Sequence, residues 1–485
     1  MKNIKFIILF TLGFAGTSCD SYLDINFDPR NPQYATAEVL LPPMFWEMTR
    51  GEVFDSRYFG MYTQNWARTS ANYFWDLHGF LAGSDAAGEK WRQHYWAIGK
   101  NIDLMITDGL AKDKFWYVGV AYAIRAWSWQ TSTDVYGEMI LKQAWEANRY
   151  IFDYDTQDLI YAEVERLCME ALTYLDMDDQ TNTLVIGDFV YQGNRDKWKK
   201  FVYAVLARNA NHLSNKSFYD PDKVIAHVDK AMASNADNFN VPHAGNSSAD
   251  GNFFGPMRNN LSVYRQTDFS IRLVDGTVFS GEVDPRMSLM FAQSSDGVYR
   301  GLTNGAGNTF SGNQAIPTFY NRYIYKDAAD YPLMTYAEMQ FIKAEAAFHK
   351  GDLTTALSAY QKGIEAHMDF AGVNPADKAT YMGSAAVAQN TGELTLSYIM
   401  LQKYIAMHGH GILETWVDLR RYHYDAAVYK TFALPNPLYS LNNGKPAYRY
   451  RPRYNSEYVW NIKSLDKIGG NNPDYHTYEP WFILP

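Results

Sequence analysis

Residues 334–370 read MTYAEMQFIKAEAAFHKGDLTTALSAYQKGIEAHMDF. Apolar residues recur in this stretch at spacings of three and four, on both sides of Gly351 and Asp352. This spacing predicts two amphipathic helices, because it places one apolar stripe along each of them. Glycine is typical of the position that ends a helix, and aspartate is typical of the residue that caps the next one. We therefore expect a helical hairpin that turns at Gly351-Asp352.

The second half of this hairpin begins with GDLTTALSAY at 351–360. It resembles the second helix of a tetratricopeptide repeat, in which an alanine packs with an aromatic residue four positions later. Such helix pairs bury their apolar faces only by stacking on neighbouring pairs, so further pairs should exist. Helical periodicity indeed marks the segments 116–130, 157–178, 196–213 and 221–234. The sequence therefore predicts a mainly α fold.

Three long segments between the helices have a different composition. Residues 20–90, 235–330 and 430–485 are rich in Gly, Asn, Pro, Ser and aromatic residues. Segments of this length without regular structure are either functional or disordered, and their aromatic content argues against disorder. We expect them to be ordered, irregular and packed against the helices. Because no low-complexity tract or linker interrupts the chain, we expect residues 19–485 to form a single domain.

The first 18 residues have the pattern of an export signal. Two lysines precede an apolar run from Phe6 to Phe14, and small residues then lead to Cys19. The run is shorter than the roughly 20 residues of a transmembrane helix. A signal that ends in small residues and a cysteine resembles a bacterial lipobox, although Gly16 stands where leucine is common. We expect residues 1–18 to be a lipoprotein signal peptide and Cys19 to be lipidated; the alternative is an ordinary signal peptide.

Composition restricts the partners of the mature chain. No apolar run after Cys19 is long enough to span a bilayer, so we expect membrane contact through the lipid anchor only. The formal charge of the whole chain is −9, and loss of Lys2 and Lys5 with the signal peptide would leave the mature chain at −11, which argues against nucleic acid as a partner. Besides Cys19 the chain has only Cys168, so the fold is not built on disulfides. Cys168 lies on an apolar helical stripe and is more typical of an inert core thiol than of a nucleophile.

A series of short motifs resembles the landmarks of one known family. In order, they are CDSYLDIN at 19–26, DPRNP at 28–32, TDVYGE at 133–138, DFVYQGNRDKWKKF at 188–201, DPR at 284–286, YAE at 336–338, AEA at 344–346 and WVDLRR at 416–421. With them the chain is similar to the SusD/RagB family of Bacteroidetes outer-membrane lipoproteins, in particular its SusD-like branch. Two stretches depart from the family pattern, GEMI at 137–140 and HGHG at 408–411. We expect these two departures to affect the subtype and the ligand of the protein more than its fold.

This resemblance implies about four tetratricopeptide-like helix pairs, packed against a large irregular half that binds the ligand. It also implies a partner, a TonB-dependent SusC-like transporter barrel over which the lipoprotein closes as a lid. Asp20 directly after Cys19 fits the export signal of that phylum and implies an outward-facing, lipid-anchored position on the outer membrane. In such systems the lipoprotein captures an oligosaccharide, or in some members a peptide, and does no chemistry on it.

The residues themselves give no convincing sign of catalysis. The sequence has no G-x-S-x-G, no H-E-x-x-H, no C-x-x-C and no P-loop. His408 and His410 could face one metal ion, but histidines flanked by glycine before a helix are more often structural. Asp418, Arg420 and Arg421 on one helix are more typical of ion pairs within a scaffold. We therefore expect no catalytic residue, no metal site and no cofactor.

Candidate ligand-binding residues lie in two loop regions. Sugars pack their C–H faces on aromatic rings and bond their hydroxyl groups to amide, carboxylate and guanidinium groups, so loops that hold both kinds of residue are candidates. Trp75 is the strongest, because Asn72 and Asp76 flank it. The alternative for each aromatic residue is a place in the core or against the barrel. The candidates are Asn65, Trp66, Tyr73, Phe74, Trp75 and Asp76 in the first region, and Phe254, Tyr264, Arg265, Tyr320 and Arg322 in the second.

Other functions stay open at this stage. The same architecture could bind peptides instead of oligosaccharides. A glycan-processing enzyme on a helical scaffold is an alternative of another class, although the two carboxylates that a glycosidase needs cannot be paired from sequence. A third reading is an interaction scaffold that uses tetratricopeptide grooves.

Overall fold

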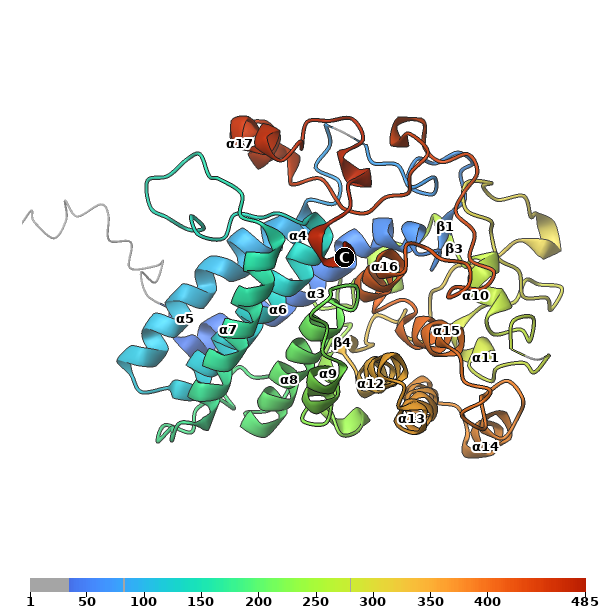
Figure 1. Ribbon diagram of the computed structural model, residues 1–485, viewed down its shortest axis with the longest axis horizontal. Coiled ribbons are helices and arrows are strands. Elements are labelled where there is room, and N and C mark those ends of the chain that lie inside the picture. Colours follow the sequence, from blue (N-terminus) through green and yellow to red (C-terminus); the bar gives the residue numbers. More distant parts are fainter. Residues whose placement is uncertain (1–34, 82, 280) are drawn as a thin grey trace, which may run out of the picture.

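The computed structural model describes residues 35–81, 83–279 and 281–485. The predicted signal peptide and Cys19 lie outside the described residues. Helices gather along one side of the molecule, and long segments with little regular structure cover the remainder (Figure 1). The arrangement confirms the prediction of a mainly α fold in which helix pairs pack against an irregular half.

Several pairs of consecutive helices pack together in the described part of the chain, among them four pairs that share no helix with one another. They are α6 (Phe115–Tyr136) with α7 (Gln157–Asp176), α8 (Arg195–Asn211) with α9 (Pro221–Val228), α12 (Tyr336–Lys350) with α13 (Leu353–Ala371), and α15 (Leu396–Met407) with α16 (Ile412–Arg421). All the segments predicted from periodicity fall on these helices. Only α9 is clearly shorter than predicted, and beyond it the carboxylate of Asp237 accepts a hydrogen bond from the Ala233 N–H at 2.9 Å and holds a turn.

The hairpin of α12 and α13 turns where the sequence predicts. Gly351 ends α12 with a φ of 83°, a left-handed conformation that glycine adopts without steric cost. The side chain of Asp352 accepts a hydrogen bond from the Thr355 N–H and so caps α13. Phe341 of α12 lies against Gly363 of α13, where an added Cβ would come within 2.8 Å of the ring. Glycine at 363 therefore allows the two helices to approach closely.

One long helix lies in a region predicted to be irregular. Helix α3 runs over Ala37–Tyr62, inside the segment 20–90, so the prediction was wrong for this part. Pro42 and Pro43 lie inside the helix, where proline removes a backbone donor and normally breaks the helix. These two prolines obscure the helical spacing of the apolar residues in this segment. Leu41, Met44 and Met48 are nevertheless fully buried at helical spacing, and this burial stabilises α3 against the core.

Further elements connect the pairs and cover their ends. They are α4 (Glu89–Arg92), the π-helical turn η1 (Gln93–Ile98), α5 (Gly99–Ala111), α10 (Asp268–Arg272), α11 (Met287–Met290), α14 (Pro375–Met382), the π-helical turn η6 (Tyr454–Tyr458) and α17 (Ile462–Lys467). Strand β1 (Ala67–Arg68) pairs antiparallel with β3 (Tyr264–Arg265), with Ala67 opposite Arg265. Strand β2 (Phe239–Val241) pairs antiparallel with β4 (Tyr331–Met334). The pair β1–β3 joins the segment after α3 to the middle of the chain.

Buried ion pairs tie the late helices to the earlier ones. Arg208 of α8 bonds Glu338 of α12, and Arg421 of α16 bonds Glu345 of α12 at 2.7 Å. Arg421 also bonds Asp418 at 2.5 Å, so these two residues form an ion pair within the scaffold as predicted. Arg420 instead donates from Nη1 to the carbonyl groups of Asp134 and Tyr448. All these side chains are buried, so each charge depends on its partner.

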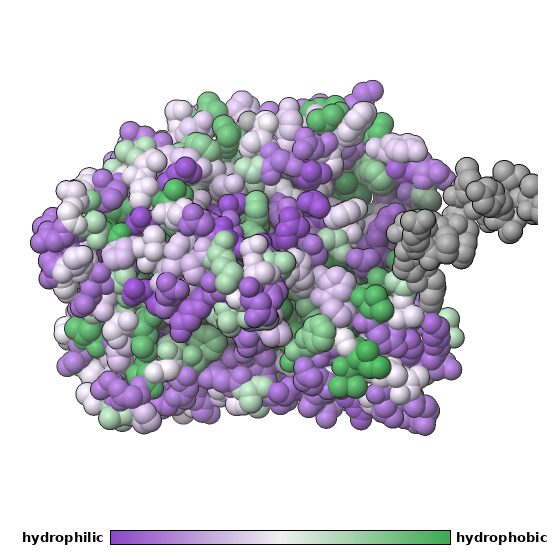
Figure 2. Space-filling model, turned by 180° about the vertical axis from the view of Figure 1, so that it is seen from behind, coloured by the Kyte–Doolittle hydropathy of each residue, from purple (hydrophilic) through white to green (hydrophobic). Residues whose placement is uncertain are grey.

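The surface carries no extended apolar band on the face seen from behind. Figure 2 shows hydrophobic side chains there in small groups, scattered among hydrophilic ones. Cys168 is buried in α7, and burial raises the pKa of its thiol, so it lies in the core as predicted. Within the described ranges, none of the helices joins enough length with enough apolar character to cross a bilayer.

Candidate functional site

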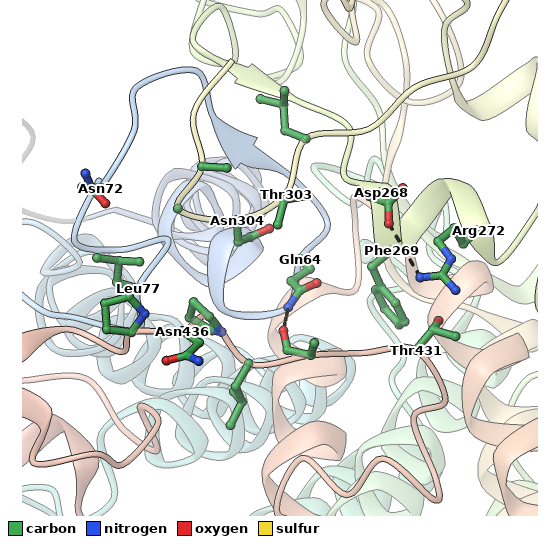
Figure 3. A pocket seen from close by; sticks show the side chains of 17 residues that line it. Gln64, Asn72, Leu77, Asp268, Phe269, Arg272, Thr303, Asn304, Thr431 and Asn436 are labelled. Atoms are coloured by element: carbon green, nitrogen blue, oxygen red, sulfur yellow. Dashed lines mark hydrogen bonds and ion pairs between the residues drawn. The ribbon is translucent and has the colours of Figure 1, made fainter. Parts of the chain in front are cut away.

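A cavity of about 360 Å³ opens between four segments that are far apart in the sequence (Figure 3). One wall is the loop after α3, and another is α10. The loop 302–306 and the C-terminal segment 431–437 complete it. The size is within the range of about 300–1,000 Å³ that is typical of small-ligand sites. Its lining consists of Gln64, Asn72, Leu77, Asp268, Phe269, Arg272, Leu302, Thr303, Asn304, Gly305, Ala306, Thr431, Ala433, Leu434, Pro435, Asn436 and Pro437.

Hydrogen bonds between the loops hold this cavity open. The amide of Gln64 donates to the Ala433 carbonyl at 2.6 Å, which fixes the C-terminal segment to the end of α3. The Asn72 N–H donates to the Gly305 carbonyl at 2.8 Å. Gly305 has a φ of 80°, and an added Cβ would come within 2.6 Å of Leu77 Cδ2. The positive φ therefore favours glycine at that position, and the absence of a Cβ leaves room for the Leu77 side chain.

The mouth of the cavity is rich in planar polar and hydroxyl side chains. Asn72, Thr303, Thr431 and Asn436 are exposed and come from three of the four segments. Asp268 and Arg272 face each other on α10 at 3.8 Å and add a carboxylate and a guanidinium group (Figure 3). Amide, hydroxyl, carboxylate and guanidinium groups together supply both donors and acceptors. The arrangement suits a ligand with many hydroxyl groups.

The buried carboxyl group of Asp76 lies behind the cavity lining and is hydrogen-bonded to Asn304, which lines the cavity. Asn304 donates from Nδ2 to the Met61 carbonyl at 2.8 Å and to Asp76 Oδ1 at 3.2 Å. Burial raises the pKa of Asp76 to about 8, although a hydrogen bond from the Arg68 N–H favours its charged form. Near neutral pH this carboxyl group therefore keeps its proton to a large extent. Asp76 is a structural group, because none of its surface is exposed.

Trp75 was the leading candidate, and the structure contradicts its assignment as a sugar platform. Its side chain is 0% exposed. The indole packs against the rings of Tyr58 and Phe80, at centroid distances of 4.6 Å and 4.7 Å, and against Tyr62 and Tyr450 at 5.5 Å. A ring enclosed on all these sides has no free face for a ligand. The flanking polar residues misled the prediction, because the turn points Asn72 outward and Trp75 inward.

Three further candidates of the first region are buried as well. Trp66 donates from Nε1 to the Arg57 carbonyl at 3.0 Å and lies against Gly60 of α3. Asn65 accepts a hydrogen bond from the Gly409 N–H at 2.9 Å and joins the loop to the end of α15. Asp76 has the supporting role described above. These three predictions were wrong, because their polar atoms are used within the protein.

Tyr73 and Phe74 remain candidates, since both are only half-buried. The guanidinium group of Arg68 lies 4.0 Å from the centroid of the Tyr73 ring. The ring of Phe74 lies 6.4 Å from that of Tyr439. Both residues follow Asn72 directly in the chain, so they flank the cavity without lining it.

The second predicted region does not converge on the cavity. Phe254 and Tyr264 are core residues, so their prediction was wrong. Arg265 is committed to carbonyl groups and donates from Nε to Ile316 at 2.8 Å. The Tyr320 hydroxyl accepts a hydrogen bond from the Leu261 N–H at 2.8 Å. Arg322 lines a separate hollow of about 630 Å³.

Several residues of the cavity were missed by the sequence analysis. Asp268, Arg272, Thr303, Thr431 and Asn436 lie in segments without a strong aromatic pattern. The available signal was the clustering of Asn, Thr and Gly at 303–308 and the Pro-Asn-Pro at 435–437. Such clusters predict turns but do not show which turns meet in space.

The histidines considered for metal binding are fixed to the backbone instead. The ring of His408 contacts the Asn65 carbonyl at 3.3 Å, and the ring of His410 contacts the Ala406 carbonyl at 3.0 Å. Burial lowers the pKa of His408 to about 3 and that of His410 to about 4. In the described part of the chain, no three His, Cys, Asp or Glu side chains are grouped so that they could hold a metal ion.

Comparison with known proteins gives a consistent result. A family described as "Starch-binding associating with outer membrane" matches residues 29–451. A SusD/RagB family structure from Bacteroides thetaiotaomicron is 22% identical, with a TM-score of 0.72 over 93% of this chain and 99% of that one. A chitin-binding protein is 20% identical, with a TM-score of 0.74 over 93% and 100%. A chitin-binding SusD homolog from Flavobacterium johnsoniae is 20% identical, with a TM-score of 0.68 over 92% and 96%. No curated protein sequence matches the chain.

Proposed function

Since this chain belongs to the SusD-like family of starch-binding proteins that associate with the outer membrane, we propose that it captures an oligosaccharide at the cell surface. In this proposal it passes the ligand to a TonB-dependent SusC-like transporter barrel. The cavity of Figure 3 holds the oligosaccharide, and the protein does no chemistry on it.

The observation that carries the proposal is the set of polar groups around the cavity mouth. Asn72, Thr303, Thr431 and Asn436 present amide and hydroxyl groups at its exposed edge. Each sugar hydroxyl both donates and accepts hydrogen bonds, so a ring of mixed donors and acceptors recognises it well. Rigid loops add affinity, because less conformational entropy is lost on binding.

The family match and the predicted lipobox support the proposed anchor and partner. Lipidation of Cys19 would hold the protein at the membrane, and an outward position would bring the cavity to external glycans. A Cys19→Ser variant should leave the membrane fraction and appear in the soluble fraction, as followed by immunoblot. Equal membrane association of variant and wild type would overturn the anchor. Co-purification of a barrel from native membranes tests the transporter partner.

A matched pair of variants tests the site. Asn72 and Asn182 are both exposed, and both have a left-handed backbone, with φ of 53° and 49°. Glycine tolerates that conformation, so Asn72→Gly and Asn182→Gly each remove an amide side chain at little backbone cost. In calorimetric titrations with maltooligosaccharides and chitooligosaccharides, Asn72→Gly should weaken binding about fivefold to tenfold, as for a lost hydrogen bond of about 1 kcal/mol. Asn182→Gly should match the wild type.

The same titrations separate the alternatives. Binding of peptides and of no oligosaccharide would favour peptide capture in the same architecture. Release of shorter sugars from a bound oligosaccharide, seen by chromatography, would favour a glycan-processing enzyme. Equal effects of Asn72→Gly and Asn182→Gly would remove the cavity as the binding site.

A further inference from the structure

We infer that a second groove, lined by aromatic rings and separate from the cavity of Figure 3, is an additional carbohydrate-binding site. This inference rests on the proposed function, because it takes the ligand to be a glycan. The groove consists of two adjoining hollows of about 430 Å³ and 320 Å³ that share Trp91, Tyr95 and Ser456. We call it the aromatic groove. Its main walls are Trp91, Tyr95, Trp96, Trp145, Phe152 and Glu457.

Both π-helical segments among the described residues line the aromatic groove. The turn η1 contributes Tyr95 and Trp96, and the turn η6 contributes Ser456 and Glu457. A π-helical turn is rare and is found frequently at functional sites. Two such turns, from segments far apart in the sequence, line this one groove, which is consistent with a functional site.

A third segment that lines the aromatic groove contributes Trp145, an aromatic residue with a strained backbone. Trp145 has a φ of 61°, a left-handed conformation that is rare and strained for a bulky side chain. Its Nε1 donates to the Tyr95 carbonyl at 2.7 Å. Its ring lies against Gly99, where an added Cβ would come within 2.2 Å of Cζ2. The surrounding contacts thus hold Trp145 in a strained position beside η1.

The chemistry of the aromatic groove matches the two-sided character of a sugar ring. The walls are aromatic, whereas the edge carries the charged heads of Arg92, Lys100, Glu146 and Arg453. A pyranose has apolar C–H faces and a polar edge of hydroxyl groups, so its faces suit the walls and its edge suits the charged rim. A purely apolar side chain of a partner protein, bound in the aromatic groove instead of a sugar, would form no hydrogen bonds with these four charged groups.

One aromatic ring of the groove, that of Trp96, is largely exposed to solvent. The side chain of Trp96 is 62% exposed, and the guanidinium group of Arg92 lies 4.6 Å from the centroid of its ring. Lys100 is exposed too, and within the described ranges its amino group has no hydrogen-bond or ion-pair partner. Both residues are therefore free to contact a ligand. The C-terminal segment lines both sites, through residues 431–437 at the cavity and residues 453–457 at the aromatic groove.

Titration calorimetry of the whole protein with maltooligosaccharides and chitooligosaccharides tests this inference. Wild type should bind two oligosaccharides per chain. Trp96→Ala should weaken one of the two sites about tenfold and leave the other unchanged, because it removes one stacking face. Lys100→Met should weaken the same site. Phe189 is also well exposed, at 56%, but lies outside the aromatic groove, so Phe189→Ala is the matched control and should bind like wild type.

The outcomes separate this inference from the proposed function. A single site that Asn72→Gly weakens, with full affinity in Trp96→Ala and Lys100→Met, would overturn the aromatic groove and keep the proposed function. Absence of any glycan binding would overturn both. Trp96→Ala that binds glycans fully but fails to co-purify with a barrel would show a docking surface and would also overturn the inference.

Discussion

The side-chain amide of Asn304 donates a hydrogen bond to the buried carboxyl group of Asp76, with 3.2 Å between Nδ2 and Oδ1. Asn304 lines the candidate cavity, whereas Asp76 lies behind the wall with no exposed surface. Burial raises the pKa of Asp76 to about 8. Asn304 in the cavity lining is therefore hydrogen-bonded to a carboxyl group that titrates close to neutral pH.

The first prediction concerns the stability that Asp76 contributes at different pH values. Its ordinary pKa is 3.8, and burial raises the folded value to about 8. Between these two values the unfolded state releases the proton and the folded state keeps it, so stability falls by up to about 1.4 kcal/mol per pH unit as pH rises. Asparagine does not titrate, so the stability of the Asp76→Asn variant should not fall in this way as the pH rises. In urea unfolding, the variant should gain stability relative to wild type across that window, and parallel pH profiles would contradict the account.

The second prediction concerns His212, whose ring lies 2.5 Å from Glu414 and 3.3 Å from Asp134. Burial alone would lower its pKa, but the two carboxylates raise it from 6.5 to about 9. A raised pKa gives full stabilisation below pH 6.5 that is lost as pH rises through about 9. His212→Gln should therefore cost most at pH 6 and progressively less towards pH 9, as measured by urea unfolding. A cost that stays constant with pH would show that the ring is uncharged.

The third prediction concerns the buried pairs of α16. Arg421 bonds Glu345 and Asp418, and Arg421→Met would leave both carboxylates without it. Removing one partner from a buried group of charges costs about 3–5 kcal/mol. Arg166→Met is the control, because Arg166 pairs with Glu163 on the exposed face of α7 and should cost less than about 1 kcal/mol. Equal losses in thermal unfolding of the two variants would contradict the assigned role.

The fourth prediction separates stability from binding at Trp75. Because its ring is enclosed by Tyr58, Tyr62 and Phe80, Trp75→Ala should lower the free energy of unfolding by about 3–5 kcal/mol. The folded fraction should bind oligosaccharides with the wild-type affinity. A variant that keeps its stability but loses binding would restore Trp75 as a ligand platform.

The helices could largely be predicted, because their burial repeats along the sequence. In α7, Val164, Leu167 and Cys168 are buried at helical spacing, and the cap at Asp352 is local too. Helix α3 escaped prediction because Pro42 and Pro43 oppose a helix locally, and only burial against distant segments outweighs them.

The candidate site could be predicted only in part. The loop after α3 was identified by its aromatic and amide residues, but which side chains point outward depends on packing. Asn72 is exposed while Trp75, three positions later, is buried. Thr303 and Asn436 join the same cavity from segments far along the chain, and a single sequence does not show which distant turns meet.

The most direct measurement for the central claim is a crystal structure of the protein with an oligosaccharide that binds in solution. We expect intact sugar rings in the cavity, with hydroxyl groups bonded to Asn72, Thr303 and Asn436. An oligosaccharide bound only outside the cavity, on the helical side of the molecule, or found cleaved, would contradict this expectation.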